Sequence, residues 1–412
     1  MSRALDQGRI RQIAEYGVIV LAVLLAWQMV VGLIAQRAPA EISLGLAPNS
    51  PAVLVRAAEA ELAAGRRDNA GALAQRALAI APFNARALSV IGRVQDAAGQ
   101  TDAADDTLTL AGNWSLREDP VHAWLVNRRL RQGDYASAFA HAETLVRRNS
   151  AAQPQLFEMF TLAAAEPRGM TALVRALALA PPWRTSYLGF ARERAGTDQL
   201  LADLAVNLQA VNDPERPGVG PMTDAELGLI YRRWHDARQP AYMVALQRRL
   251  GRPETVDGVW NGDFEMAGDG PAPLAWAFQP TAGASAQIVE TGEPNRGRAL
   301  LVETDGLASG VLAAQLLLLP PGPAEIHISQ KLEAAAGGAR FDWRVLCMET
   351  GQVLASGSTG ASPDSEWTDR VQALTTPTTQ CTAQWLQLTT RGGDRPSPLR
   401  AWFDDIRIRA AN

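Results

Sequence analysis

The sequence has few of the residues from which reactive centres are usually built. Its 412 residues include two cysteines and four histidines, and the histidines are scattered along the chain. It contains no Gly-x-Ser-x-Gly, His-Glu-x-x-His, phosphate-loop or Cys-x-x-Cys pattern. These absences argue against the common hydrolase, zinc-protease, nucleotide-binding and dithiol classes. We therefore expect a protein that is not an enzyme.

Positive charge is also in short supply. Lys331 is the only lysine. The chain has 39 basic and 43 acidic residues, which gives a formal net charge of −4. Because nucleic-acid binding needs a basic surface to neutralise phosphates, we expect no nucleic-acid partner.

One long apolar run stands near the N-terminus. Residues 17–35 carry no charge, and at about 1.5 Å per residue a helix of this length spans the roughly 30 Å hydrocarbon core of a bilayer. The alternatives are a buried helix or a secretory signal peptide, whose apolar region is shorter and is followed by a small-residue cleavage site. Arg3, Arg9 and Arg11 precede the run and Arg37 follows it, which places the N-terminus in the cytoplasm. The sequence thus predicts a cytoplasmic segment 1–16, a single transmembrane helix 17–35, a linker 36–48 and a periplasmic bulk, anchored in a bacterial inner membrane.

A 34-residue period follows the linker. Gly65, Gly99 and Gly133 are spaced by that period, and each suits the left-handed end of a first helix over 51–64, 85–98 or 119–132. Small residues and a proline recur after these glycines: Ala70, Ala77 and Pro82, then Ala104 and Ala111, then Ala138. Such a period predicts antiparallel helix pairs stacked into a solenoid, which binds partners through a surface.

This pattern resembles the tetratricopeptide repeat. The shared features are a small residue at Ala58 or Gly92, the glycine turn, and the alanines of the second helix. The third unit departs from the pattern at Val126 and Leu145. The resemblance implies a protein partner. Further helical segments up to residue 250 extend the prediction to one all-α domain over 49–250.

After residue 251 the pattern changes to short apolar runs separated by Gly, Pro, Asp and Thr, which predicts an all-β sandwich over 251–412. Eight strands are expected, over 286–290, 299–303, 311–319, 324–333, 341–348, 367–373, 383–390 and 401–408. Eight strands in a domain of this size favour a two-sheet jelly roll.

The two ends of this domain carry a second resemblance. It opens with Asn-Gly-Asp-Phe-Glu at 261–265 and closes with Phe-Asp-Asp-Ile at 403–406, and it resembles carbohydrate-binding modules and galactose-binding-like jelly rolls. First and last strands that pair would bring Glu265 close to Asp404 or Asp405. The resemblance implies a structural Ca²⁺ there, with oxygen ligands. Alternatively, these acids cap turns or pair with Arg407 or Arg409.

Glycan binding requires exposed aromatic rings and a few polar groups. Trp276 and Trp367 are flanked by loop or acidic residues, so we expect these two rings to be exposed. The alternation around Trp343 places that ring in the core. Cys347 and Cys381 both lie in this domain, and an even pair in an oxidising compartment predicts a disulfide.

Together these features predict a multidomain chain with an N-terminal transmembrane helix, an all-α tetratricopeptide-like solenoid and a C-terminal jelly-roll sandwich. We expect a periplasmic scaffold whose repeats bind a protein and whose sandwich contacts glycan, in the synthesis, polymerisation or export of surface polysaccharide. The alternatives are an adaptor for envelope assembly that binds only proteins and, less favoured, a glycan-processing enzyme that uses paired carboxylates.

Overall fold

The computed structural model describes residues 39–211, 220–251, 258–266, 270–334, 338–359 and 364–411, together with seven isolated positions before residue 31. Of the 19 residues of the predicted transmembrane segment 17–35, 12 lie outside the described residues. Within the part that is described, no helix combines the length and apolarity needed to cross a bilayer. The chain divides into two compact units, Met1–Leu156 and Phe157–Asn412.

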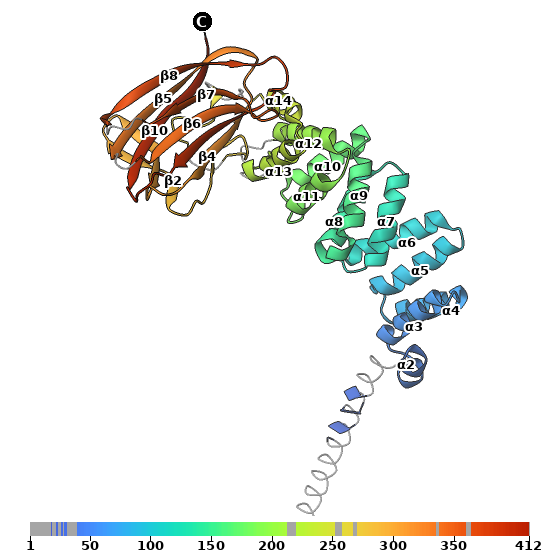
Figure 1. The fold of residues 1–412 in the computed structure, drawn as a ribbon. Helices are drawn as coiled ribbons and strands as arrows, with labels where there is room; N and C mark the ends of the chain where they lie inside the picture. Colours follow the sequence, from blue (N-terminus) through green and yellow to red (C-terminus); the bar gives the residue numbers. More distant parts are fainter. Residues whose placement is uncertain are drawn as a thin grey trace, which may run out of the picture. The chain divides into compact units, whose positions relative to one another are not determined.

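The first unit is built from helix pairs that repeat every 34 residues (Figure 1). A short helix, α2 (Ala40–Leu46), comes first. The three pairs are α3 (Pro51–Ala63) with α4 (Arg67–Ile80), α5 (Ala85–Ala97) with α6 (Thr101–Trp114), and α7 (Asp119–Arg131) with α8 (Tyr135–Arg148). The helix-pair prediction for this region is confirmed.

The glycines and small residues of the period explain the geometry of the pairs. Gly65, Gly99 and Gly133 have φ values of 76°, 78° and 71°, the left-handed conformation that a helix end requires. The recurring alanines have no exposed surface, which shows that the helices approach closely where these residues lie. A Cβ atom at Gly92 would lie 2.5 Å from the Leu108 side chain, so α5 and α6 need a glycine there.

The second unit begins within α9 (Gln153–Ala163), and its described residues before the sandwich form five further helices. These are α10 (Pro167–Ala178), α11 (Arg184–Glu193), α12 (Asp198–Ala210), α13 (Asp224–Asp236) and α14 (Pro240–Arg249). A capping box of Thr223 and Glu226 starts α13, and the buried Arg184 donates a hydrogen bond to Glu226 at 2.8 Å. The region after residue 150 is therefore helical, as predicted, and its membership in one domain over 49–250 stays a prediction.

Two five-stranded antiparallel sheets form the C-terminal sandwich. Sheet A has the order β1 (Ala277–Phe278), β4 (Gly310–Leu317), β9 (Gln384–Arg391), β6 (Arg340–Cys347) and β7 (Val353–Ser358). Sheet B has the order β2 (Ala284–Glu293), β3 (Arg296–Thr304), β10 (Leu399–Ala410), β5 (Gly322–Ala334) and β8 (Asp364–Thr376). The eight predicted strands are present, and β1 and β7 add to them.

The core lies between the two sheets, where alternating apolar side chains of both inner faces meet. Trp343 is 4% exposed and belongs to this core, as the alternation predicts. Cys347 and Cys381 form a disulfide, which confirms the predicted pairing. The bond ties the end of β6 to the segment that leads into β9.

Candidate functional site

The Asn-Gly-Asp-Phe-Glu motif forms a tight turn that docks on β10. Asn261 and Phe264 have positive φ values of 49° and 55°, and the side chain of Asn261 accepts a hydrogen bond from the Met266 amide at 2.9 Å. The Ile406 amide donates to the Gly262 carbonyl at 2.9 Å. A Cβ atom at Gly262 would lie 1.9 Å from the Ile406 carbonyl oxygen, so only glycine fits this contact.

Strand β10 has a β-bulge at the point where the turn docks. The pairing with β5 shifts register between Asp404 and Arg407, and Asp405 has a φ value of 49°. The bulge thus places two successive carboxylates in the middle of β10, and the Asp405 amide donates to Asp404 Oδ1 at 2.7 Å.

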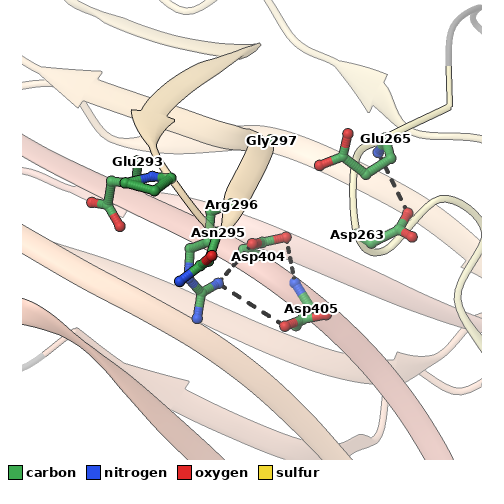
Figure 2. A pocket seen from close by; sticks show the side chains of 9 residues that line it. Asp263, Glu265, Glu293, Asn295, Arg296, Gly297, Asp404 and Asp405 are labelled. Atoms are coloured by element: carbon green, nitrogen blue, oxygen red, sulfur yellow. Dashed lines mark hydrogen bonds and ion pairs between the residues drawn. The ribbon is translucent and has the colours of Figure 1, made fainter.

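A pocket of about 480 Å³ lies between the docked turn, the bulge and the β2–β3 turn (Figure 2). Its lining residues are Asp263, Glu265, Glu293, Pro294, Asn295, Arg296, Gly297, Asp404 and Asp405. The structure therefore brings Glu265, Asp404 and Asp405 to one pocket, as the pairing of the domain's two ends predicts.

Arg296 supplies the positive charge in this pocket. Its Nη1 donates to Asp404 Oδ2 at 2.7 Å and lies 4.0 Å from Asp405 Oδ2 (Figure 2). Burial raises the pKa of Asp404, which is 6% exposed, and the hydrogen bonds from the Asp405 amide and Arg296 oppose that rise. Arg296 is the first residue of β3, more than a hundred residues before Asp404, and no local pattern in the sequence connects the two.

The other carboxylates of the pocket also have protein partners. Glu265 Oε1 accepts a hydrogen bond from the Arg298 amide at 2.8 Å, and Asp405 Oδ1 lies 3.5 Å from Arg407 Nη2. Asp405 thus forms the pair with Arg407 that the sequence left open as the alternative to calcium.

In this structure the carboxylates of the expected Ca²⁺ site are engaged by protein groups: Asp404 by Arg296, Asp405 by Arg407 and Glu265 by the Arg298 amide. Within the described ranges, no group of three or more His, Cys, Asp or Glu side chains is placed to hold a metal. A cation in the pocket would have to compete with the guanidinium of Arg296 for Asp404. The predicted Ca²⁺ remains an untested prediction.

Trp276 does not have the exposure that the sequence suggested. Its side chain is 7% exposed, its Nε1 donates to the Asn261 carbonyl at 3.2 Å, and its ring lies 5.6 Å from that of Phe264. The Pro- and Gly-rich loop that carries Trp276 folds against the docked turn instead of projecting into solvent. The expectation that Trp276 offers an exposed ring for a sugar is therefore wrong.

Trp367 is half-buried on the outer face of sheet B. The guanidinium carbon of Arg296 lies 4.0 Å from the centre of its ring, a cation–π contact. Its Nε1 donates to Glu293 Oε2 at 2.9 Å, and Glu293 Oε1 is 3.0 Å from Lys331 Nζ. The hydrogen bond from Lys331 lowers the pKa of Glu293, so this carboxylate stays ionised at neutral pH.

Trp402 is a second half-buried ring on the same face, and sequence reasoning did not single it out. Its neighbours Ala401 and Phe403 belong to the core, so alternation along β10 directs Trp402 outward. Trp402 pairs with Lys331 on β5, and its Nε1 donates to Glu333 Oε1 at 2.8 Å.

These side chains form one surface, which we call the tryptophan platform: Trp367, Trp402, Lys331, Glu293 and Glu333. Lys331 joins its two halves, because it lies opposite Trp402 and binds the carboxylate that holds Trp367. Arg400 forms two ion pairs beside the platform, from Nη2 to Glu303 Oε1 at 2.6 Å and from Nη1 to Glu333 Oε2 at 3.4 Å. The Trp402 ring beside these ionised groups can stack on a ligand and hydrogen-bond its polar edge, whereas a ligand would reach the Trp367 face that Arg296 covers only by displacing that guanidinium.

Comparisons with known proteins give matches among solved structures only. No protein-family model matches the chain, and no curated protein matches it. The chain is similar to a family 61 carbohydrate-binding module in complex with β-1,4-galactotriose, at 14% identity and a TM-score of 0.28, over 38% of this chain and 100% of that one. It is also similar to a putative sugar-binding protein from Bacteroides thetaiotaomicron, at 11% identity and a TM-score of 0.28, over 38% and 100%. A third match is the C-terminal family 22 carbohydrate-binding module of Clostridium thermocellum Xyn10B, at 15% identity and a TM-score of 0.27, over 38% and 96%.

Proposed function

We propose that the sandwich binds glycan on the tryptophan platform. The observation that carries this proposal is that Trp367 and Trp402 lie on the same outer face of sheet B, each fixed by a hydrogen bond from its indole nitrogen to a glutamate. A ring held in this way loses little conformational freedom when a sugar face stacks on it. Lys331 and the two glutamates supply donors and acceptors for hydroxyl groups at the edge of the rings.

A glycan array probed with the full chain tests this proposal, and titration calorimetry follows with the strongest binder. Trp402→Ala should weaken binding by about 1.5 kcal/mol, or roughly tenfold, because one stacking surface is lost. Val371→Ala is the matched control, since Val371 is 56% exposed on β8 of the same sheet but is not part of the platform. Failure to bind any glycan, or equal affinity of Trp402→Ala and the parent, would overturn the proposal.

We also propose a wider context for this binding. The helix pairs, as a tetratricopeptide-like solenoid, would hold a protein partner, and 17–35 would anchor the chain in the inner membrane with its bulk in the periplasm. The process would be synthesis, polymerisation or export of surface polysaccharide. A pulldown with candidate polymerase and export proteins, repeated with the helix pairs altered, tests the scaffold role. Partner binding without any glycan binding would favour the alternative, a protein–protein adaptor.

The proposed role is binding and not catalysis. Glycoside cleavage by two carboxylates requires one as a general acid and the other as a nucleophile or base. In the pocket Asp404 is held by Arg296 and Asp405 lies near Arg407, so both carboxylates are engaged by cations. Release of sugar from bound glycan by the purified chain would contradict this part of the proposal.

We propose calcium binding at the pocket only as a competitor of Arg296 for the Asp404 carboxylate. Arg296→Gln removes that competitor and leaves Asp404, Asp405, Asp263 and Glu265 in place. Titration of CaCl₂ into the parent and the variant by calorimetry decides between the two: binding by both supports a resident ion, and binding by the variant alone assigns the cation role to Arg296.

A further inference from the structure

An exposed apolar patch covers one edge of the first two helix pairs. It consists of Ile80, Phe83, Leu110, Trp114 and Leu116, which are 50%, 83%, 41%, 41% and 65% exposed. We call this surface the helix-end patch, because its members lie at the ends of α4 and α6 and in the loops that follow. The other exposed large apolar side chains described between residues 39 and 156 are Ile42 and Leu46, both on α2.

The repeat explains why these side chains lie at the same end of neighbouring helix pairs. Ile80 and Trp114 are equivalent positions, 34 residues apart, at the last turns of α4 and α6. The rings of Phe83 and Trp114 lie 5.3 Å apart, which confirms that the two units contribute to one surface. Because Phe83 is 83% exposed, its ring projects from the loop into solvent instead of lining a groove.

Two arginines border the patch. Arg76 lies one turn before Ile80 on α4, and Arg117 follows Leu116 directly; both are exposed. In the part of the chain that the structure describes, neither forms an ion pair with a carboxylate, and Arg76 Nη2 donates instead to the Pro48 carbonyl at 3.2 Å. Among the described residues, the border of the patch therefore carries two positive charges without a carboxylate partner.

The contact with Pro48 also shows where the patch lies along the chain. Pro48 belongs to the linker 36–48, which directly follows the proposed membrane span. Even a fully extended linker of this length reaches at most about 45 Å. With the chain anchored through 17–35, the patch is tethered close to the bilayer. It combines projecting aromatic and aliphatic side chains with flanking arginines, a combination suited to an anionic interface.

We propose that the helix-end patch rests on the bilayer, with Phe83 and Trp114 inserted at the level of the headgroups and Arg76 and Arg117 bound to anionic phospholipid. This inference depends on the membrane anchor of the proposed function. It commits to a lipid surface; an acidic protein segment on the patch is the competing outcome.

The test uses the full chain reconstituted in vesicles of phosphatidylglycerol and phosphatidylcholine. Asn113→Cys places an environment-sensitive fluorophore beside Trp114, and Ala103→Cys places it at the opposite end of α6; both positions are exposed. The two native cysteines are joined in a disulfide, so the label attaches only to the introduced residue. Brominated lipids should quench the Asn113 probe at least about threefold more than the Ala103 probe.

Each outcome has a definite meaning. Preferential quenching of the Asn113 probe that falls in pure phosphatidylcholine, and falls again when Phe83→Ser and Trp114→Ser are added, supports the inference. If the protein floats with the vesicles but the two probes are quenched equally, the inference is wrong while the anchor stands, and the patch is left to a protein segment. If the protein does not float, both the anchor and the inference fail.

Discussion

Asp105 is predicted to hold α6 and α7 together, and replacing it should open this part of the solenoid. Its carboxylate accepts hydrogen bonds from Arg129 at 2.7 and 2.8 Å and from Arg128 at 3.1 Å, and its side chain is 15% exposed. These contacts, chiefly the hydrogen bonds from Arg129, lower the pKa of Asp105 from 3.8 to about 2. At about 1.4 kcal/mol for each pKa unit, the interaction stabilises the folded unit by about 2 kcal/mol.

Asp105→Asn keeps the shape of the side chain but removes its charge. Hydrogen exchange followed by mass spectrometry on the full chain should then show roughly 30-fold faster exchange in peptides from α6 and α7 at neutral pH. Glu143→Gln is the control, because the Glu143–Arg147 pair is an exposed pair within one helix, worth at most about 0.5 kcal/mol.

The same interaction predicts a pH dependence. Because folding lowers the pKa of Asp105, its contribution is fully present above pH 4 and is lost as the pH falls towards 2. The parent should therefore lose protection of α6 and α7 over that interval, whereas Asp105→Asn should not show this step. Exchange in Asp105→Asn no faster than in the Glu143→Gln control would refute the reasoning.

Three further predictions concern other parts of the chain. Reduction of the Cys347–Cys381 disulfide, which closes a loop of 34 residues, should destabilise the sandwich by about 4 kcal/mol in denaturant unfolding; an unchanged midpoint would show that the cross-link restricts little of the unfolded chain. Gly262→Ala should destabilise it by about 3 kcal/mol, because a Cβ atom would lie 1.9 Å from a β10 carbonyl. Gly292→Ala has free space and meets only the strain of its left-handed backbone (φ 73°), so it should cost less than half of this; equal melting temperatures would argue against the docked turn. Burial lowers the pKa of His141 to about 4, so the third helix pair should lose stability as the pH falls from 6.5 towards 4; if His141→Asn shows the same loss, another group is responsible.

Much of the fold could be predicted because its determinants are local and periodic. The 34-residue spacing places every helix of the three pairs, since the turn glycines and buried alanines recur within each unit. Eight strands are marked by apolar alternation or continuous apolar runs. The two additional strands lack this signal: β1 has only two residues, and β7 contains Ser356, Gly357 and Ser358, residues typical of turns.

The candidate site was only partly predictable, because its geometry depends on contacts between distant segments. The motif residues Glu265, Asp404 and Asp405 were found, since they stand in recognisable patterns at the two ends of the domain. Arg296 was missed because nothing near it in the sequence points to the β10 bulge. Trp276 was misjudged because a Pro- and Gly-rich loop can fold inward as well as outward. Its burial depends on distant contacts, with the core, the Phe264 ring and the Asn261 carbonyl.

The position of β10 has a consequence for how the sandwich is made. This strand follows the other nine in the sequence, yet it lies in the middle of sheet B between β3 and β5. During synthesis, we therefore expect the facing edges of β3 and β5 to lack their hydrogen-bond partner until the residues of β10 have left the ribosome. We expect the nascent domain to remain protease-sensitive until that moment, and a premature stop codon before Leu399 to abolish the whole sandwich and not just its edge.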